Sequence, residues 1–450
     1  MEAPGWRAAA RRRPARGQKA PRAHRRRRQG ARSPREGRMT KHVTVVGAGI
    51  VGIACAAYLR RDGHEVTVVD MRDPGEYCSF GNAGALSPGS CVPYALPGVL
   101  KRVPGWLADP HGPLSIRPRY LPKALPWLMR FVAASHPDRV GPIADALRAL
   151  LRGTFEAYAP LVRDAGAEDL IRQSGYLFVY ETEQGLRNDA RSWKIRRDRG
   201  VVCEEIDAAR IREMEPALRG IYTRGVWLPE QGYTVNPGRL TKMLAAQLVK
   251  DGGKLVRAQV LDIDVGPDGP RALVTDAGRL AVDVLVIAAG AHSHTLSAKV
   301  GDKVPLETQR GYHVSIENPT VQLNRPVSSG EGKFFVTPME TGLRVAGTVE
   351  FAGLDAPPDY SRADVLLEQA KRMFPELSGS KVTKWMGHRP QIPDTLPVIS
   401  RGSKFTNVYH AFGHGHLGMT AAAPTGRLLA EMVGDRPPHF EPAPYRVDRF

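Results

Sequence analysis

The chain has 450 residues, of which 42% are hydrophobic and 24% charged, and its formal net charge is +18. This length allows a large core and indicates two or three domains, or one discontinuous two-domain enzyme. The four cysteines form no CxxC pair, no Cys/His cluster has zinc spacing, and no run of 18 apolar residues occurs. The sequence therefore predicts no metal site and no membrane-spanning helix.

The positive charge is concentrated in the first 38 residues, which contain 14 Lys/Arg and two acids. This segment has no hydrophobic periodicity, so residues 1–38 are predicted to be a basic disordered extension. A nucleic-acid-binding arm and an Arg-rich transit peptide are alternatives. We expect a non-functional leader instead, with Met39 as the real start and no nucleic-acid partner.

The clearest folding signal is a strand–turn–helix–strand unit between Lys41 and Asp70. Val43–Val46 reads as a buried strand, 50–61 as a helix, and 65–69 as a second strand that ends in Asp70. The connecting turn fits GxGxxG. Its three glycines permit, in order, a tight turn, the approach of a pyrophosphate to the backbone and close packing of the helix on the strand. The acid at the end of the second strand is expected to bind ribose hydroxyls. Predicted nucleotide-binding residues are Val46, Gly47, Ala48, Gly49, Ile50, Val51, Gly52 and Asp70.

The later elements indicate a sheet assembled from distant segments. A Pro- and Trp-rich stretch at 92–140 predicts short helices and extended pieces, and an amphipathic helix is predicted at 142–165. Further elements follow as a strand at 175–180, a helix at 237–250, strands at 254–256, 259–265 and 284–289, strands with turns between 311 and 349, a hairpin turn at 340–342 and a helix at 424–433. Because the apolar strand 284–289 follows the glycine turn by some 240 residues, this order favours an FAD protein over a nicotinamide dehydrogenase.

Four motifs carry a resemblance to a known family. They are Ser79–Gly89 (SFGNAGALSPG), Val284–Ser293 (VLVIAAGAHS), Gly387–Pro397 (GHRPQIPDTLP) and Gly413–Thr420 (GHGHLGMT). Together with the glycine turn, they resemble the D-amino-acid oxidase and dehydrogenase superfamily, nearest to bacterial D-amino-acid dehydrogenase. The resemblance runs from Lys41 to about Gly434.

The resemblance implies an α/β fold with a discontinuous Rossmann-like FAD-binding domain and a second, mostly antiparallel α+β substrate domain. We assign 39–91, 204–305 and 386–440 to the first, and 92–203 and 306–385 to the second. It also implies non-covalent FAD. Further cofactor-binding residues are expected to be Ser79, Asn82, Ala83, Gly84, Leu86, Val260, Ala289, Gly290, Gly413, His414, Gly415, His416, Leu417, Gly418 and Met419.

Three residues are expected to act on the substrate or flavin. Arg389 is similar to the family arginine that holds a substrate carboxylate through two parallel hydrogen bonds; a structural salt bridge to Asp394 is the alternative. Tyr312 is either a pocket wall or sheet core. His414 is expected to face the flavin beside a glycine-rich loop, whose helix dipole favours reduced flavin.

The implied reaction is oxidative deamination by hydride transfer from the substrate Cα to flavin N5. The substrate is a D-alanine-like acid, D-proline or D-hydroxyproline, and the electrons pass to a quinone or respiratory carrier. A glycine- or sarcosine-type oxidase that uses oxygen is the alternative enzyme, and a flavin-binding module without turnover is a third reading. We expect a bacterial catabolic enzyme in the cytoplasm. Residues 94–131 are expected to pack on the substrate domain; alternatively, they contact the inner face of the membrane.

Overall fold

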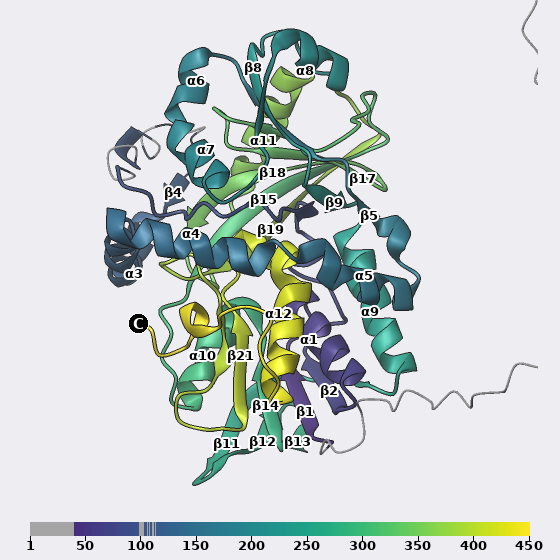
Figure 1. Cartoon of the computed structure of the whole chain (residues 1–450), viewed down its shortest axis with the longest axis vertical. Helices are drawn as coiled ribbons and strands as arrows, with labels where there is room; N and C mark the ends of the chain where they lie inside the picture. Colours follow the sequence, from purple (N-terminus) through teal and green to yellow (C-terminus); the bar gives the residue numbers. More distant parts are fainter. Residues whose placement is uncertain (1–39, 99–102, 106, 108, 110–111, 113) are drawn as a thin grey trace, which may run out of the picture. The chain divides into compact units, whose positions relative to one another are not determined.

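The computed structural model describes residues 40–98, 103–105, 107, 109, 112 and 114–450 (Figure 1). The predictions for the basic extension 1–38 and for Met39 lie outside the described residues. None of the described helices combines the length and the apolar character needed to cross a bilayer.

The first large element is a six-stranded sheet assembled from three distant parts of the chain. In sheet order its strands are β10 (Lys254–Arg257), β2 (Glu65–Asp70), β1 (His42–Val46), β14 (Val284–Ile287), β21 (Val408–Phe412) and β20 (Val398–Arg401). All neighbours are parallel except β20, which runs antiparallel to β21. The predicted assembly of this sheet from distant segments is therefore confirmed. In the predicted βαβ unit the helix has the expected bounds, and β1 and β2 are each one residue longer than predicted.

This sheet is covered on both faces because its side chains alternate along each strand. Val284 and Val286 pack with one set of helices, whereas Leu285 and Ile287 pack in a different cluster. The first face carries α1 (Ile50–Arg61), α5 (Thr154–Ala165), α9 (Pro237–Lys250) and α12 (Gly418–Val433). The second face carries α10 (Ser293–Lys299) and the meander of β11 (Val260–Gly266), β12 (Gly269–Thr275) and β13 (Gly278–Ala281). Figure 1 shows α1 and α12 side by side.

The second large sheet is mixed and mostly antiparallel. Its order is β19 (Lys381–Gln391), β15 (Glu307–Glu317), β18 (Gly342–Phe351), β17 (Phe335–Met339), β16 (Val327–Ser329), β6 (Tyr176–Tyr180), β8 (Arg224–Leu228) and β7 (Glu204–Asp207), and β4 (Leu114–Ile116) pairs with β18. The helices α11 (Ser361–Met373) and α8 (Ala208–Met214) pack against one face. The hairpin predicted at 340–342 joins β17 to β18.

Sheet membership places some segments differently from the expected domain division. β7 and β8 lie within the expected nucleotide-binding segment 204–305, yet they pair in the second sheet. β19 likewise belongs to the second sheet up to Gln391, beyond the expected boundary at 385. A chain that crosses between two sheets leaves no compositional change at the crossing, so these boundaries depend on strand pairing.

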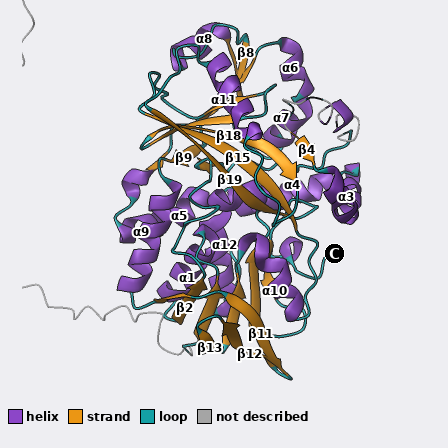
Figure 2. Cartoon of the chain, turned by 180° about the vertical axis from the view of Figure 1, so that it is seen from behind, coloured by secondary structure: helices purple, strands orange, loops and turns teal. Residues whose placement is uncertain are grey.

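The Pro-rich stretch and the helices after it connect the two sheets. They comprise the 3₁₀ turn η1 (Pro118–Tyr120), α3 (Leu121–Ala134), α4 (Pro137–Leu151) and α5. The single helix predicted at 142–165 is wrong in one respect, because the chain breaks between α4 and α5 at Arg152 and Gly153. α4 and α5 both pack on α12, so part of the expected substrate segment 92–203 lies against the nucleotide-binding half (Figure 2).

The remaining short elements complete the fold. They are β3 (Ala85–Leu86), η2 (Glu168–Leu170), β5 (Ile171–Arg172), α6 (Glu183–Asn188), α7 (Ala190–Arg197), β9 (Gly232–Thr234), η3 (Gly290–His292), η4 (Gly415–Leu417) and η5 (Ala443–Tyr445). β3, β9 and β5 form a small antiparallel sheet.

Candidate functional site

A cavity of about 1020 Å³ lies where the carboxyl ends of the parallel strands meet the second sheet. Val46 at the end of β1, Ala289 after β14 and Phe412 at the end of β21 all line it. Strands β15, β18 and β19 contribute the opposite part of the wall. Ligands of open α/β sheets bind at this edge, beyond the carboxyl ends of the strands.

The glycine turn between β1 and α1 opens directly into the cavity. Gly47 has a φ of +118°, and a Cβ there would lie 2.3 Å from the carbonyl oxygen of Ala288. A Cβ on Gly52 would lie 1.9 Å from the carbonyl oxygen of Gly47, so this glycine permits close packing of helix on strand, as predicted, without lining the cavity. Gly49 is the N-cap of α1 and supplies no capping side chain, which leaves the helix N-terminus facing the cavity.

Two polar side chains organise this turn. Asp70 accepts hydrogen bonds from the backbone amides of Ala48 at 2.7 Å and Arg72 at 2.9 Å. A carboxylate has about four acceptor positions, so Asp70 can also accept hydrogen bonds from ribose hydroxyls. Ser79 accepts a hydrogen bond from the amide of Ile50 at 2.8 Å, which leaves its hydroxyl proton able to donate to a phosphate oxygen.

A second helix N-terminus reaches the same cavity at the Gly413–Gly418 loop, which precedes α12. The Nε2 atom of His414 shares a hydrogen bond with Thr425 Oγ1 at 2.9 Å, and burial lowers the pKa of His414 to about 3. His414 is therefore neutral near pH 7. Positive potential at this end comes from the helix N-terminus rather than from that imidazole.

His416 contacts a residue that the sequence did not single out. Its Nδ1 is hydrogen-bonded to the hydroxyl of Tyr94, and the two ring centroids are 4.6 Å apart. Both residues line the cavity. Desolvation and the neighbouring Arg389 lower the pKa of His416 to about 3, so this ring is also neutral.

Arg389 lies in the cavity wall on β19 and is held by backbone carbonyls. Its guanidinium donates to the oxygens of Thr348 at 2.9 Å and Gly347 at 3.3 Å. The alternative salt bridge to Asp394 is wrong, because the Asp394 carboxylate pairs with Arg449 at 2.9 Å. Among the described residues, no ion pair to Arg389 is present, so its charge is available to an anionic ligand.

A β-bulge creates the two carbonyl acceptors. Arg310 pairs with Glu350 and Tyr312 pairs with Gly347, so two residues of β18 stand opposite the single residue Gly311. Thr348, at the bulge, has a φ of +54°, and its buried hydroxyl oxygen has no hydrogen-bond partner among the described residues. Such strained positions persist where the surrounding structure holds them, and they cluster at functional sites.

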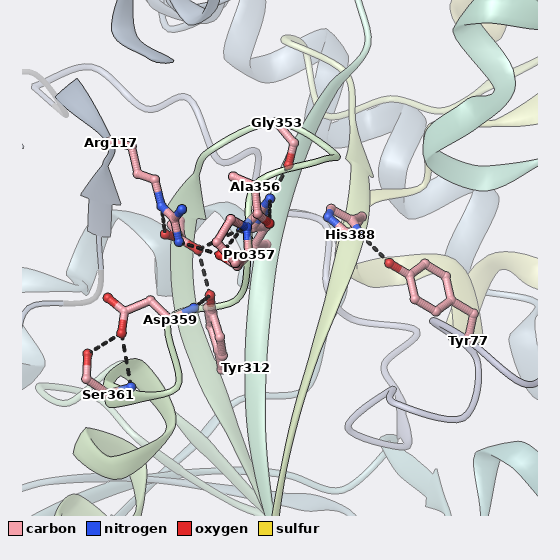
Figure 3. Close-up of polar contacts among 11 residues, drawn as sticks. Tyr77, Arg117, Tyr312, Gly353, Ala356, Pro357, Asp359, Ser361 and His388 are labelled. Carbon is pink, nitrogen blue, oxygen red and sulfur yellow. Dashed lines mark hydrogen bonds and ion pairs between the residues drawn. The ribbon is translucent and has the colours of Figure 1, made fainter. Parts of the chain in front are cut away.

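Tyr312 contributes to the cavity wall, but its hydroxyl is engaged elsewhere. The side chain is 1% exposed and packs in the cluster that includes α11. Its hydroxyl donates to Glu350 Oε2 at 2.6 Å and accepts from the amide of Asp359 at 3.0 Å (Figure 3). These contacts of the hydroxyl match the alternative in which Tyr312 is a residue of the sheet core.

The same network holds the loop that follows β18. Glu350 also accepts from Arg117 Nε at 2.7 Å, and the buried Arg310 donates to the carbonyls of Gly353, Pro357 and Ala356 (Figure 3).

Most predicted cofactor-binding residues line the cavity, but four do not. Gly84, Leu86 and Leu417 lie outside the wall, as does Gly52. Leu86 has no exposed surface and belongs to the core cluster on the helical face of the first sheet, and Leu417 packs in a separate core cluster. Alternation along a strand or turn sends one neighbour to the cavity and the next to the core. Tyr94, Thr348 and Trp385 line the cavity without a sequence signal, since each is placed there by tertiary contacts.

The residues present suit a long dinucleotide cofactor. Two helix N-termini open onto one continuous cavity, and an acidic side chain sits at the end of β2. The backbone approaches closely at the glycine turn, and a Cβ on Gly290 would meet nothing within 4 Å. A pyrophosphate at the first helix and an electron-accepting ring at the second would each face a positive helix end.

Comparisons with known proteins also indicate a dinucleotide cofactor. A family model described as FAD dependent oxidoreductase matches residues 42–432, and one described as pyridine nucleotide-disulphide oxidoreductase matches residues 3–75. A protein of Bradyrhizobium diazoefficiens named D-amino-acid oxidase is 41% identical over 417 residues, covering 91% of this chain and 99% of that protein. A protein of the same organism named D-amino acid dehydrogenase is 32% identical over 424 residues, covering 91% of this chain and 98% of that protein.

Solved structures share the fold. L-proline dehydrogenase from P. horikoshii superposes with a TM-score of 0.70 at 19% identity, covering 92% of this chain and 98% of that chain. Glycine oxidase from Bacillus cereus superposes with a TM-score of 0.68 at 20% identity, covering 88% and 96% respectively.

Proposed function

This chain belongs to the FAD dependent oxidoreductase family, and from that premise we propose that it oxidatively deaminates D-amino acids. The proposed substrates are a D-alanine-like acid, D-proline or D-hydroxyproline, and the proposed acceptor is a quinone or respiratory carrier. FAD, held without a covalent link by the glycine turn and the Gly413–Gly418 loop, would supply the redox chemistry as the acceptor of a hydride from the substrate Cα. The names of the 41% and 32% identical relatives support the amino-acid substrate class.

The observation that carries this proposal is the guanidinium of Arg389 in the cavity wall. Two backbone carbonyls fix its plane, and no carboxylate pairs with it among the described residues. A planar guanidinium binds a carboxylate through two parallel charge-assisted hydrogen bonds, which orient the ligand as well as attract it. The substrate Cα, one bond away, would then be held in a fixed position.

The charge around Arg389 favours the reactive form of the amine. Among the described residues that line the cavity, the acids are Asp70, Asp73 and Glu76, on β2 and in the turns that follow it. No lining carboxylate therefore stabilises an ammonium beside Arg389. A neutral amine can release electron density toward the breaking bond, so the site needs no dedicated general base.

Apolar side chains beside β19 suit an apolar substrate. Trp127 is stacked on Phe131 with ring centroids 5.3 Å apart, and its indole N–H donates to the carbonyl of Gln391 at 3.2 Å. Both aromatic rings line the cavity. A small aliphatic or cyclic side chain would bury its surface there, at about 25 cal/mol per Å².

The outer face of α3 supports an acceptor in a membrane. Leu121, Leu125 and Met129 are exposed by 44%, 50% and 59%, and they recur every four residues on one side of the helix. α3 contains Lys123 and Arg130 and no acid, which suits an anionic lipid surface. Oxygen as the acceptor, for a D-amino acid, glycine or sarcosine, is the second candidate, because the 41% identical relative is named an oxidase.

The test is an anaerobic titration of the purified FAD-loaded full chain with D-alanine, D-proline, D-hydroxyproline, L-alanine, glycine and sarcosine. We expect the visible flavin absorbance to bleach with the D-amino acids and to persist with L-alanine. Reoxidation is then followed with a soluble quinone and with oxygen, and peroxide is measured. Bleaching by glycine and sarcosine alone, or reoxidation by oxygen with peroxide formation but not by the quinone, would favour the second candidate. No bleaching by any of these compounds would refute the proposal.

A further inference from the structure

We propose that Tyr94, held by His416, is a second substrate-binding group: its hydroxyl oxygen accepts a hydrogen bond from the substrate amine while Arg389 binds the carboxylate. This inference rests on the proposed function and adds a residue that distinguishes amino acids from other carboxylic acids.

Tyr94 is held in place from both ends. Its backbone amide donates to Thr395 Oγ1 at 3.1 Å, and its hydroxyl contacts Nδ1 of His416. Tyr94 is 39% exposed and is part of the cavity wall, so a ligand in the cavity can reach it. Thr395 follows β19 and His416 precedes α12, so Tyr94 is fixed by the two segments that carry the carboxylate-binding and flavin-facing groups.

The direction of the Tyr94–His416 hydrogen bond is set by the charge states of both groups and by the tautomer of His416. His416 is neutral, because burial and Arg389 lower its pKa to about 3. Although Tyr94 is partly exposed, desolvation raises the pKa of its hydroxyl, which lies against His416, so the hydroxyl stays protonated. A phenol is a better donor than acceptor, so we assign to His416 the tautomer with its proton on Nε2. In that tautomer the hydroxyl of Tyr94 donates to Nδ1.

That orientation leaves the lone pairs of the Tyr94 oxygen for a donor in the cavity. Gln391, two residues after Arg389, forms a β-bridge with His414, two residues before His416. Tyr94, Arg389 and His416 also line the same cavity, so the Tyr94–His416 pair and the carboxylate-binding group border one space. The donor that we assign to this oxygen is the substrate amine, because it is attached to the same carbon as the carboxylate that Arg389 would bind. A neutral oxygen accepts from the amine without stabilising an ammonium as a carboxylate would, which agrees with oxidation of the neutral amine.

The experiment compares two kinds of ligand on the FAD-loaded full chain. The first is the best D-amino acid of the panel, measured by KM and kcat. The second is propionate, which has the carboxylate but no amine, measured as a competitive inhibitor and by perturbation of the flavin spectrum.

For Tyr94→Phe we expect KM for the D-amino acid to rise roughly ten-fold, as for a lost hydrogen bond. The inhibition constant of propionate should stay within about two-fold of its original value, since its carboxylate still meets Arg389. His416→Phe should raise KM in the same direction, because the hydroxyl of Tyr94 loses its fixed orientation. Tyr360→Phe, which changes an exposed tyrosine at the start of α11, is the matched control and should change neither constant.

Retention of the flavin spectrum and of the thermal midpoint shows that each variant is folded. An unchanged KM in Tyr94→Phe, or an equal loss for propionate and the amino acid, would overturn the inference alone. No turnover of any amino acid by the unaltered enzyme would overturn the proposed function and this inference with it.

Discussion

Replacing Gly311 by alanine tests how Arg389 is positioned. A Cβ at this position would lie 2.0 Å from Nη2 and 2.1 Å from Cζ of Arg389, whereas ordinary contacts begin near 3.4 Å. The guanidinium would have to move by about 1.4 Å, the difference between these distances. That movement disrupts the hydrogen bonds to Thr348 and Gly347, which are 2.9 Å and 3.3 Å long.

The expected cost is catalytic rather than structural. A displacement of about 1 Å in a positioning group costs on the order of 100-fold in rate, or about 2.7 kcal/mol. Gly311 does not have a positive φ, so alanine is compatible with the strand backbone. We expect kcat/KM for the D-amino acid to fall by about 100-fold, with FAD still bound and propionate inhibition weakened.

The assay is steady-state kinetics together with the visible spectrum of the purified holoenzyme. Gly220→Ala is the matched control, because a Cβ there meets nothing within 4 Å and its φ is not positive. If Gly311→Ala keeps kcat/KM within about three-fold, the argument for Arg389 fails. If it loses FAD, the space above Gly311 belongs to the cofactor rather than to the guanidinium.

Three further outcomes follow from the same contacts. Arg389→Met should lower kcat/KM by at least about 30-fold and Arg389→Lys by less, because lysine keeps the charge but not the paired donors; equal losses would contradict bidentate binding. Burial lowers the pKa of His313 from 6.5 to about 3, so this residue binds fewer protons in the folded than in the unfolded protein. The contribution of neutral His313 to the free energy of unfolding is therefore complete above pH 6.5 and is lost as the pH falls toward 3. His313→Gln should therefore remove about 1 kcal/mol of the stability lost between pH 7 and pH 5.5, measured by denaturant titration; an unchanged pH dependence would refute this. Glu350→Gln leaves the fully buried Arg310 without its counter-charge and should lower the free energy of unfolding by about 3 kcal/mol, seen as a lower thermal midpoint. Glu213→Gln, which removes a surface ion pair, is the control and should shift the thermal midpoint little.

The sequence determined the nucleotide-binding half because the signals there are local. The glycine turn, the helix after it and the acid at the end of the second strand are consecutive in the chain, and each needs only its neighbours. The bounds of α1 and α9 were predicted residue for residue for the same reason: periodicity and caps mark both ends. The motifs that resemble the family also predicted FAD, which the family match confirms, whereas the role of Arg389 stays a prediction.

Only the tertiary structure decided how these pieces form a site. Tyr94 meets His416 across 322 residues, and no local pattern marks either as a partner. The bulge at Thr348 sets the direction of Arg389, because an extra residue in one strand is visible only against its neighbour. Tyr312 and Leu86 looked like site residues by motif, yet the hydroxyl of Tyr312 and the side chain of Leu86 are taken up by the core. Strand pairing and side-chain direction depend on contacts between distant segments, and a single sequence does not record which segments meet.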